Sequence, residues 1–199
     1  MPPEQRRAQL LDAAFAVLHR VELPELNMEA VAQQAGVGKP VLYTVFKTRA
    51  ELVAALLERE RERGLDQVVT ALPTDLIGSD PVAAASATVE AFVGMALENP
   101  TRWRLILATP GGAPSEYREA LRNSRSIILE HAEALVRMGL ALEPRWAGAD
   151  SALLANSLLT VAEMLGRLAV NDPGQYPRER LLGFPRTLVR LVMGVPPGD

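Results

Sequence analysis

Apolar residues recur at helical spacing along almost the whole chain, and no segment shows the strict alternation that is typical of a half-buried strand. In the first segment, Leu10, Leu11, Ala14 and Leu18 fall on one helix face, so residues 5–20 are expected to form a helix. Proline and glycine clusters at 73–81, 109–114 and 171–177 carry turn chemistry and divide the rest. The pattern predicts an all-α fold of about nine helices.

Capping residues set the boundaries of three further helices near the amino end. Asn27 can accept from the free amides of a short helix over 28–34, and Gly36 can end it in the left-handed conformation. A third short helix is expected over 39–46. Thr48, followed three residues later by Glu51, has the spacing of a capping box and predicts a long fourth helix. The ERERER run in that helix, residues 58–63, is expected to form a solvated face.

The second half of the chain predicts a helical body. Asp80 before Pro81 is expected to start a helix, and a short apolar helix over 101–108 carries Trp103. A long helix follows, marked by apolar residues from Tyr117 onward. The segments 146–170 and 178–193 are apolar on several sides, which predicts burial on more than one face. Pro185 is expected to kink or restart the last of them.

Residues 28–46 have the pattern of a helix-turn-helix. Steeply crossing helices need a small residue where the backbones meet, here Ala32, and a glycine at the sharp turn, here Gly36. In such a unit the second helix enters the major groove by its amino end, which places four residues nearest the bases: Lys39, Pro40, Val41 and Thr44. The alternative is an ordinary pair of short packed helices joined by a tight turn.

The wider frame supports the helix-turn-helix. LLDAAF in the first helix, AGV at the turn and LYTVF before the fourth helix together resemble the DNA-binding domain of the tetracycline-repressor (TetR) family. The resemblance implies a three-helix DNA-binding domain over residues 1–48, and a helical ligand-binding and dimerisation domain over residues 49–199. It also implies a ligand-responsive regulator, expected to be a repressor, that binds double-stranded operator DNA as a homodimer. A small-molecule effector would release it.

Three positions depart from the family's usual residues. The family often has threonine at Asn27, serine or threonine at Gly38 and lysine at Arg49. Asn27 keeps a capping oxygen and Arg49 keeps the charge, whereas Gly38 loses the hydroxyl cap, so Pro40 is expected to help start the third helix by fixing its backbone angle. The candidate DNA-contacting residues are Asn27, Gly38, Lys39, Pro40, Val41, Tyr43, Thr44, Lys47 and Arg49.

By carry-over from the family, Tyr43, Lys47 and Arg49 resemble phosphate contacts. Lys39 is the candidate for a base edge, because it can donate to guanine O6 or N7. Two alternatives stay open: Tyr43 could be a half-buried packing residue, and Lys39 could touch phosphate alone.

The body has no motif of its own, so its ligand role depends on the resemblance. An apolar pocket with few polar groups would favour a hydrophobic effector. The candidate pocket residues are Phe92, Met95, Trp103, Leu107, Tyr117, Asn156, Thr160 and Glu163, and ordinary core packing is the alternative for each. The segments 146–170 and 178–193 are expected to dimerise, since they offer more apolar surface than one small core can cover.

Composition argues against other functional classes. The 199 residues contain no cysteine, and the two histidines, His19 and His131, lie far apart, so neither a metal site nor a cofactor is expected. Without a paired histidine or a glycine-rich phosphate loop, an enzyme is the weakest reading. A helical sensor or carrier that no longer binds DNA remains the alternative. The amino end mixes acidic and basic residues, unlike a signal peptide, and no uninterrupted apolar run reaches membrane length, so we expect a cytoplasmic protein without a membrane partner.

Overall fold

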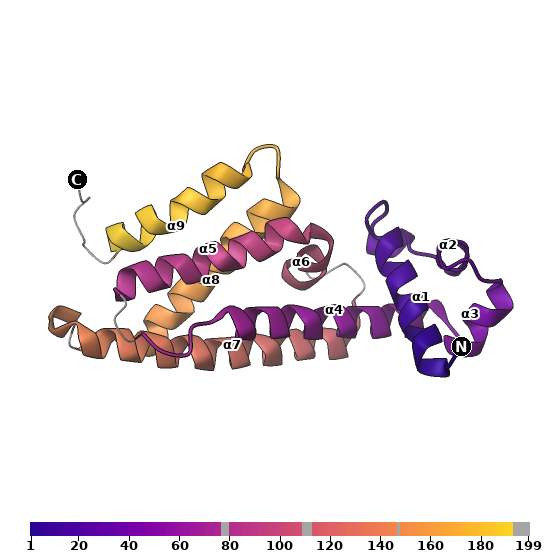
Figure 1. The fold of residues 1–199 in the computed structure, drawn as a ribbon, viewed down its shortest axis with the longest axis horizontal. Helices are drawn as coiled ribbons and strands as arrows, with labels where there is room; N and C mark the ends of the chain where they lie inside the picture. Colours follow the sequence, from indigo (N-terminus) through magenta and orange to yellow (C-terminus); the bar gives the residue numbers. More distant parts are fainter. Residues whose placement is uncertain (77–79, 109–112, 147, 193–199) are drawn as a thin grey trace.

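The computed structural model describes residues 1–76, 80–108, 113–146 and 148–192, with the backbone alone at 145 and 189–192 (Figure 1). Within these residues the chain forms nine α-helices, two short 3-10 turns and no strand, which confirms the all-α prediction. The helices are α1 (Pro3–Val17), α2 (Met28–Gln34), α3 (Lys39–Val45), α4 (Arg49–Ala71), α5 (Pro81–Glu98), α6 (Pro100–Leu107), α7 (Ser115–Leu142), α8 (Ser151–Asn171) and α9 (Arg178–Val192). The 3-10 turns are η1 (Leu23–Glu25) and η2 (Pro144–Trp146). The expected turn residues 109–112 and Met193 lie outside the described residues.

Helices α1, α2 and α3 form a compact head around a shared apolar core (Figure 1). The side chain of Asn27 accepts from the backbone N–H of Ala30 at 2.9 Å and so caps α2, as predicted. Gly36 follows α2 with φ of 65°, a conformation that costs a residue with a Cβ roughly 1–2 kcal/mol. Leu42 and Phe46 are buried against the first two helices, which fixes the angle at which α3 crosses α2.

Helix α4 belongs to both parts of the molecule. It runs from the head into the body, where α7 lies beside it (Figure 1). Its first turns contribute Leu52, Leu56 and Leu57 to the head core, while Val68 packs in the core of the body. The predicted division after residue 48 stays a prediction, and the head core continues past it into α4.

The start of α4 carries one half of the expected capping box. The hydroxyl of Thr48 accepts from the backbone N–H of Glu51 at 3.1 Å, as predicted. The carboxylate of Glu51 does not return to Thr48 but accepts from the backbone N–H of Lys47 at 2.7 Å, one residue earlier. Two of the free amides around this turn are therefore satisfied, which makes α4 begin firmly at the edge of the head.

The body is a layered helical bundle in which α8 is central. It packs against α5, α6 and α7, while α9 covers the outer side of α5 (Figure 1). Gly166 allows a close approach, because a Cβ at this position would lie 2.8 Å from Leu107 Cδ1 and 3.0 Å from Phe92 Cε1. A larger residue here would require the side chains of Leu107 and Phe92 to shift.

One expectation for the last helices needs correction, and a second is answered in part. Helix α8 begins at Ser151 rather than near Trp146, because the side chain of Asp150 accepts from the backbone N–H of Leu153 at 3.0 Å and caps it there. Trp146 instead ends the turn η2. Helix α9 continues through Pro185 without restarting, and a kink at this residue stays a prediction. Proline removes one intrahelical donor but does not by itself end a helix whose other face is packed, and α9 packs along α5.

Among the described helices, α8 is the one whose length and mean hydropathy would also suit a membrane span. It carries a glutamate and an arginine in its second half, and it packs against three other helices of the body. These contacts are those of the core helix of a folded bundle.

Candidate functional site

The exposed face of α3 brings together most of the residues predicted to reach DNA. Gly38 precedes the helix without a side-chain cap, and Pro40 stands in the first turn, where a missing N–H costs no intrahelical bond. Leu42 points into the core, as expected. The side chains on the exposed face are those of Lys39, Pro40, Val41, Tyr43 and Thr44.

Three side chains on this face differ in how they are held. Tyr43 is 45% exposed, which places it on the surface rather than in the head core. Lys39 forms an ion pair of 3.0 Å with Glu29 of α2, and because both groups are exposed the pair is worth about 1 kcal/mol or less. Because this pair is weak, a DNA phosphate or base could replace Glu29 as the partner of Lys39 at low cost. The hydroxyl of Thr44 donates to the carbonyl of Val41 at 2.6 Å.

The remaining predicted contacts flank α3 and already have structural partners. The side chain of Asn27 caps α2. The guanidinium of Arg49 donates from Nη2 to the carbonyl oxygens of Leu23, at 2.6 Å, and Pro24, at 3.2 Å, and so ties the first turn of α4 to η1. The side chain of Lys47 is exposed beside this turn. Contacts of these residues with DNA stay predictions.

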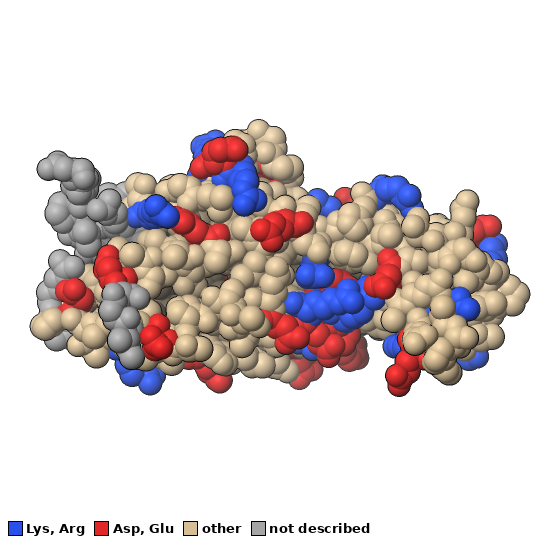
Figure 2. Space-filling view, in the orientation of Figure 1, with Lys and Arg blue, Asp and Glu red and all other residues tan. Residues whose placement is uncertain are grey.

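The body contains a cavity of about 190 Å³ whose walls are almost wholly apolar, and we call it the apolar cavity. The end of α4 and the helices α5, α7, α8 and α9 line it, and uncharged residues cover much of the strip between α5 and the α4–α7 pair in Figure 2. No charged side chain is among its described lining residues. The hydroxyls of Thr88 and Ser157 donate to carbonyls of their own helices, at 2.9 and 2.8 Å. A ligand in this cavity would thus meet an almost wholly apolar wall.

A second cavity, of about 350 Å³, lies between α4, α6, α7 and α8, and we call it the arginine cavity. It shares three apolar lining residues with the apolar cavity, Phe92, Ile128 and Leu159, so the two spaces adjoin. Five arginines and one acidic residue are among its lining residues: Arg61, Arg118, Arg122, Arg125, Arg167 and Glu163.

Five of the eight predicted pocket residues line a cavity. Phe92 lines both, Met95 lines the apolar cavity, and three line the arginine cavity: Trp103, Leu107 and Glu163. The structure does not bring the other three to either space. Those three are Tyr117, Asn156 and Thr160.

These three residues have other contacts. Tyr117 is buried and its hydroxyl donates to the carbonyl of Leu105 at 3.1 Å, and burial raises the pKa of that hydroxyl. Asn156 and Thr160 lie on the exposed side of α8, where their oxygens accept from Arg125 at 3.1 and 3.5 Å. Their sequence pattern, a polar group on an otherwise apolar helix, is the same for a pocket and for such a surface contact.

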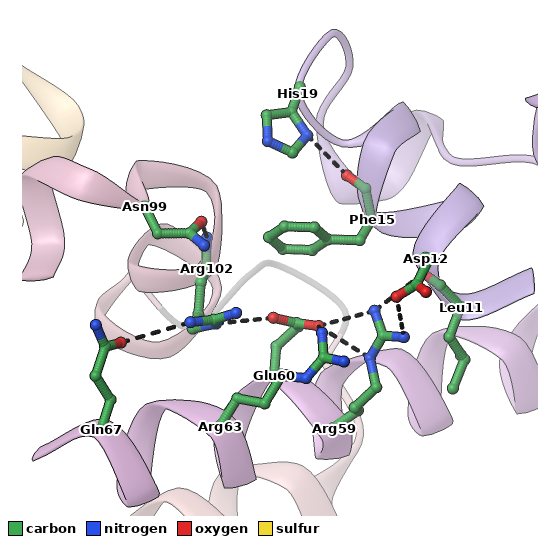
Figure 3. Close-up of polar contacts among 10 residues, drawn as sticks. All are labelled: Leu11, Asp12, Phe15, His19, Arg59, Glu60, Arg63, Gln67, Asn99 and Arg102. Carbon is green, nitrogen blue, oxygen red and sulfur yellow. Dashed lines mark hydrogen bonds and ion pairs between the residues drawn. The ribbon is translucent and has the colours of Figure 1, made fainter. Parts of the chain in front are cut away.

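Sequence reasoning missed the buried charge cluster at Glu60 (Figure 3). Within the run that was expected to be solvated, this carboxylate is 0% exposed, so the expectation is wrong at this position. One oxygen lies 2.9 Å from Arg59 and 3.2 Å from Arg63, and the other lies 2.8 Å from Arg102 of α6. The sequence spacing could have predicted this burial, since Glu60 follows Leu56 by four residues and precedes Gly64 by four, and so lies on the buried stripe of α4.

The same cluster reaches the head. Arg59 also donates to the carboxylate of Asp12, at 2.8 Å, and to the carbonyl of Leu11, at 3.1 Å, both in α1 (Figure 3). Through Glu60, this arginine is connected to Arg102 in the first turn of α6. The cluster thus joins α1 of the head, α4 and α6 of the body by charge-assisted hydrogen bonds, which are stronger and more directional than apolar contacts.

A neighbouring pair ties α4 to α7. The guanidinium of Arg61 donates to both carboxylate oxygens of Glu58, at 2.6 and 2.9 Å, and to the hydroxyl of Ser124 at 2.6 Å. The hydrogen bonds from Arg61 lower the pKa of the Glu58 carboxyl, and the same bonds raise the pKa of Arg61. The position of α4 relative to α7 is therefore fixed by a charged contact as well as by packing.

Comparison with known proteins identifies relatives of this chain. Residues 10–56 match the family model described as bacterial regulatory proteins of the tetR family. The HTH-type transcriptional activator FasR of Mycolicibacterium smegmatis is 36% identical over 106 residues, which cover 53% of this chain and 47% of that protein. The chain thus aligns with about half the length of this relative.

Solved structures share the fold along almost the whole chain. A TetR-like transcriptional regulator from Rhodococcus sp. RHA1 superposes with a TM-score of 0.71 at 22% identity, covering 98% of this chain and 99% of that one. FadR from Bacillus subtilis in complex with stearoyl-CoA gives a TM-score of 0.70 at 13% identity, covering 96% and 99%. Residues 10–56 thus match the tetR family of bacterial regulatory proteins, and the chain shares the fold of TetR-like transcriptional regulators.

Proposed function

We propose that this regulator binds operator DNA as a homodimer through α3, and that a hydrophobic effector in the apolar cavity releases it. The observation that carries the proposal is the double role of α4. Its first turns pack in the head core, and its later turns supply Gly64 and Val68 to the walls of the cavities. An effector that binds one position of α4 better than another would therefore shift the head, which is the differential affinity that such a switch requires. A cytoplasmic location belongs to the same proposal.

For DNA recognition we assign Lys39 and Tyr43 the central contacts. Lys39 can donate to a guanine edge or a phosphate, and Tyr43 projects its hydroxyl from the same exposed face. The free amides at the amino end of α4 and the nearby side chain of Lys47 suit a phosphate beside this face. The other residues predicted to touch DNA would position α3 or approach the sugar-phosphate backbone of the DNA.

The test of this assignment is the affinity of a Lys39→Ala/Tyr43→Ala variant for DNA fragments selected by the wild-type protein. We expect a loss of roughly thirtyfold to a thousandfold, from two contacts worth about 1–2 kcal/mol each. Arg137→Ala, which removes one positive charge from the exposed side of α7, serves as control and should change the affinity less than twofold. Unchanged binding by the double variant would show that α3 is not the reading helix. If the wild-type protein selects no DNA at all, the chain is instead a sensor or carrier.

For the effector we propose a long-chain acyl compound. The apolar cavity has no charged lining residue in the described part of the chain, so it favours an aliphatic chain over a polar metabolite. Two relatives with the same fold point the same way, since one is solved with stearoyl-CoA and another is a putative fatty acid metabolism regulator from Clostridium perfringens.

Two alanines of α5 give a matched test of the effector site. Ala85 lines the apolar cavity, and Ala83 is exposed on the same helix. We expect Ala85→Leu to weaken binding of stearoyl-CoA at least fivefold by filling the cavity, and Ala83→Leu to leave it unchanged. The fluorescence of Trp146, which lines this cavity, reports binding in a Trp103→Phe background. Equal affinities for the two variants would place the effector elsewhere.

Dimerisation is proposed through α8 and α9. Both helices expose large apolar side chains, with Leu153 66% exposed and Phe184 42% exposed. Such side chains on a small soluble body are typical of a surface that a second copy covers. Sedimentation equilibrium should find a dimer for the wild-type protein and a monomer for Leu153→Glu/Phe184→Glu. A dimer that survives both changes would move the interface to other helices.

The direction of regulation has a second candidate. We propose a repressor, but the relative FasR is named an activator. A reporter fused to the selected operator distinguishes the two, because deletion of the regulator raises expression under a repressor and lowers it under an activator.

A further inference from the structure

The arginine cavity holds more positive charge than the acidic residues beside it can neutralise. Arg61 is held by Glu58, and Arg125 donates to Glu163 at 2.8 Å. Glu163 is the one acidic residue among the described residues that line the cavity. Three more arginines line the same space, and no carboxylate neutralises these three positive charges in the described part of the chain.

These three arginines lie on two facing helices. Arg118 and Arg122 come from α7, and Arg167 comes from α8. In the described structure none of them forms an ion pair, and the one hydrogen bond among them runs from Arg118 Nη1 to the carbonyl of Ala113 at 2.6 Å. Arg167 is half-buried without any partner in that part of the chain. Arg118 and Arg122 are exposed, so of the three Arg167 is the one partly withdrawn from water. An unpaired guanidinium in that position is uncommon, since removing a charge from water is costly unless it is compensated.

Trp103, which also lines the arginine cavity, carries an unsatisfied donor within the described structure. Its indole is 3% exposed, and Nε1 has no hydrogen-bond partner among the described residues. The indole nitrogen can only donate, so it requires an acceptor. Buried donors in folded proteins almost always have one, but this nitrogen is enclosed by the protein, so a ligand oxygen would reach it only after the cavity wall shifts.

The adjoining apolar cavity indicates what the ligand is. Phe92, Ile128 and Leu159 line both spaces, so a molecule could occupy both at once. The two volumes, about 190 and 350 Å³, together fall within the roughly 300–1,000 Å³ typical of small-molecule sites.

We infer that the arginine cavity binds the anionic head group of the effector, while the aliphatic chain lies in the apolar cavity. This inference rests on the proposed function and adds the head group to it. Arginine pairs two N–H groups with two oxygens of a carboxylate or a phosphate, so both heads fit the chemistry of the site. The geometry assigns Arg122 and Arg167, from facing helices, as the principal head-group contacts, with Arg118 at the surface.

Three probes with one chain length separate the head from the chain: octadecanol, stearate and octadecyl phosphate, each used below its critical micelle concentration. Binding is followed by the fluorescence of Trp103 in a Trp146→Phe background. We expect at least one of the two anions to bind ten times or more tightly than octadecanol. Arg122→Gln/Arg167→Gln should remove this preference and leave the affinity for octadecanol within twofold. Arg137→Gln, on the same helix but outside both cavities, should change nothing, and Arg122→Lys/Arg167→Lys should restore part of the preference.

The outcomes distinguish the two levels of the proposal. If octadecanol binds as tightly as both anions, or if the double glutamine variant keeps the preference, the head-group site is wrong and the apolar effector site stands. If no probe binds, both fail. A preference for octadecyl phosphate alone assigns a phosphorylated head, and a preference for stearate alone assigns a free carboxylate. Thermal unfolding of each variant, within a few degrees of the wild-type protein, shows that the fold is retained.

Discussion

Neutralising the buried carboxylate of Glu60 should destabilise the protein far more than neutralising its exposed neighbour Glu62. Glu60→Gln keeps the size of the side chain but removes the negative charge between Arg59, Arg63 and Arg102. Losing one partner of a buried ion pair costs about 3–5 kcal/mol. Two of these arginines are 15% exposed and the third is 46% exposed, so partial rehydration reduces the cost. We expect a loss of about 2–4 kcal/mol in the free energy of unfolding.

Urea unfolding followed by circular dichroism, at one fixed protein concentration, measures this difference. The control is Glu62→Gln on the same helix, whose carboxylate is 62% exposed and 3.8 Å from Arg61. We expect the control to change the free energy of unfolding by less than about 0.5 kcal/mol. A cost below about 1 kcal/mol for Glu60→Gln, or equal costs for the two variants, would refute the reasoning that the cluster holds α1, α4 and α6 together.

Three further predictions concern pH, a helix start and a buried hydroxyl. Hydrogen bonds from Arg61 lower the pKa of Glu58, so the ionised carboxylate stabilises the folded protein above the usual carboxyl pKa of about 4.3, and this stabilisation is lost as pH falls through the lower pKa of the folded state. In urea titrations the wild-type protein should therefore lose more stability between about pH 6 and about pH 3 than Glu58→Gln does. Gly38→Ser should raise the thermal midpoint, because the serine cap adds a few tenths of a kcal/mol and the less flexible unfolded chain adds about 0.4–1 kcal/mol at a φ of −70° that suits any residue. Gly36→Ser, at φ of 65°, should lower it. Tyr117→Phe should cost about 1–2 kcal/mol in urea unfolding, because a buried carbonyl of α6 loses its donor, and a neutral result would contradict that hydrogen bond.

The head was predictable because local signals fix its helices. The cap at Asn27, the left-handed turn at Gly36 and the cap at Thr48 act on neighbouring residues, and each is found at the predicted place. The exposed face of α3 followed from the same periodicity, since Leu42 must point inward for α3 to pack. Local capping also explains why the prediction that α8 begins near Trp146 is wrong. That prediction followed the apolar residues, although Asp150 is the stronger signal for the start of a helix.

The buried charges and the cavities depend on contacts between distant segments. Glu60 is buried because Arg102, which lies 42 residues further along the chain, approaches it from α6. Nothing within the ERERER run distinguishes this glutamate from Glu58 or Glu62 except its place on the apolar stripe. Likewise, Phe92 and Met95 reach a cavity while Tyr117 packs in the core, although all three are large side chains on apolar faces. Such differences arise from how helices cross, which the periodicity of one helix does not encode.

The affinity for selected operator DNA, measured by fluorescence anisotropy with and without saturating stearoyl-CoA, tests the central claim most directly. If an effector in the body moves the head through α4, the acyl compound should weaken operator binding at least tenfold, and Ala85→Leu should reduce that effect. An operator affinity that stays within twofold, or that rises, would contradict release of the DNA by an acyl effector.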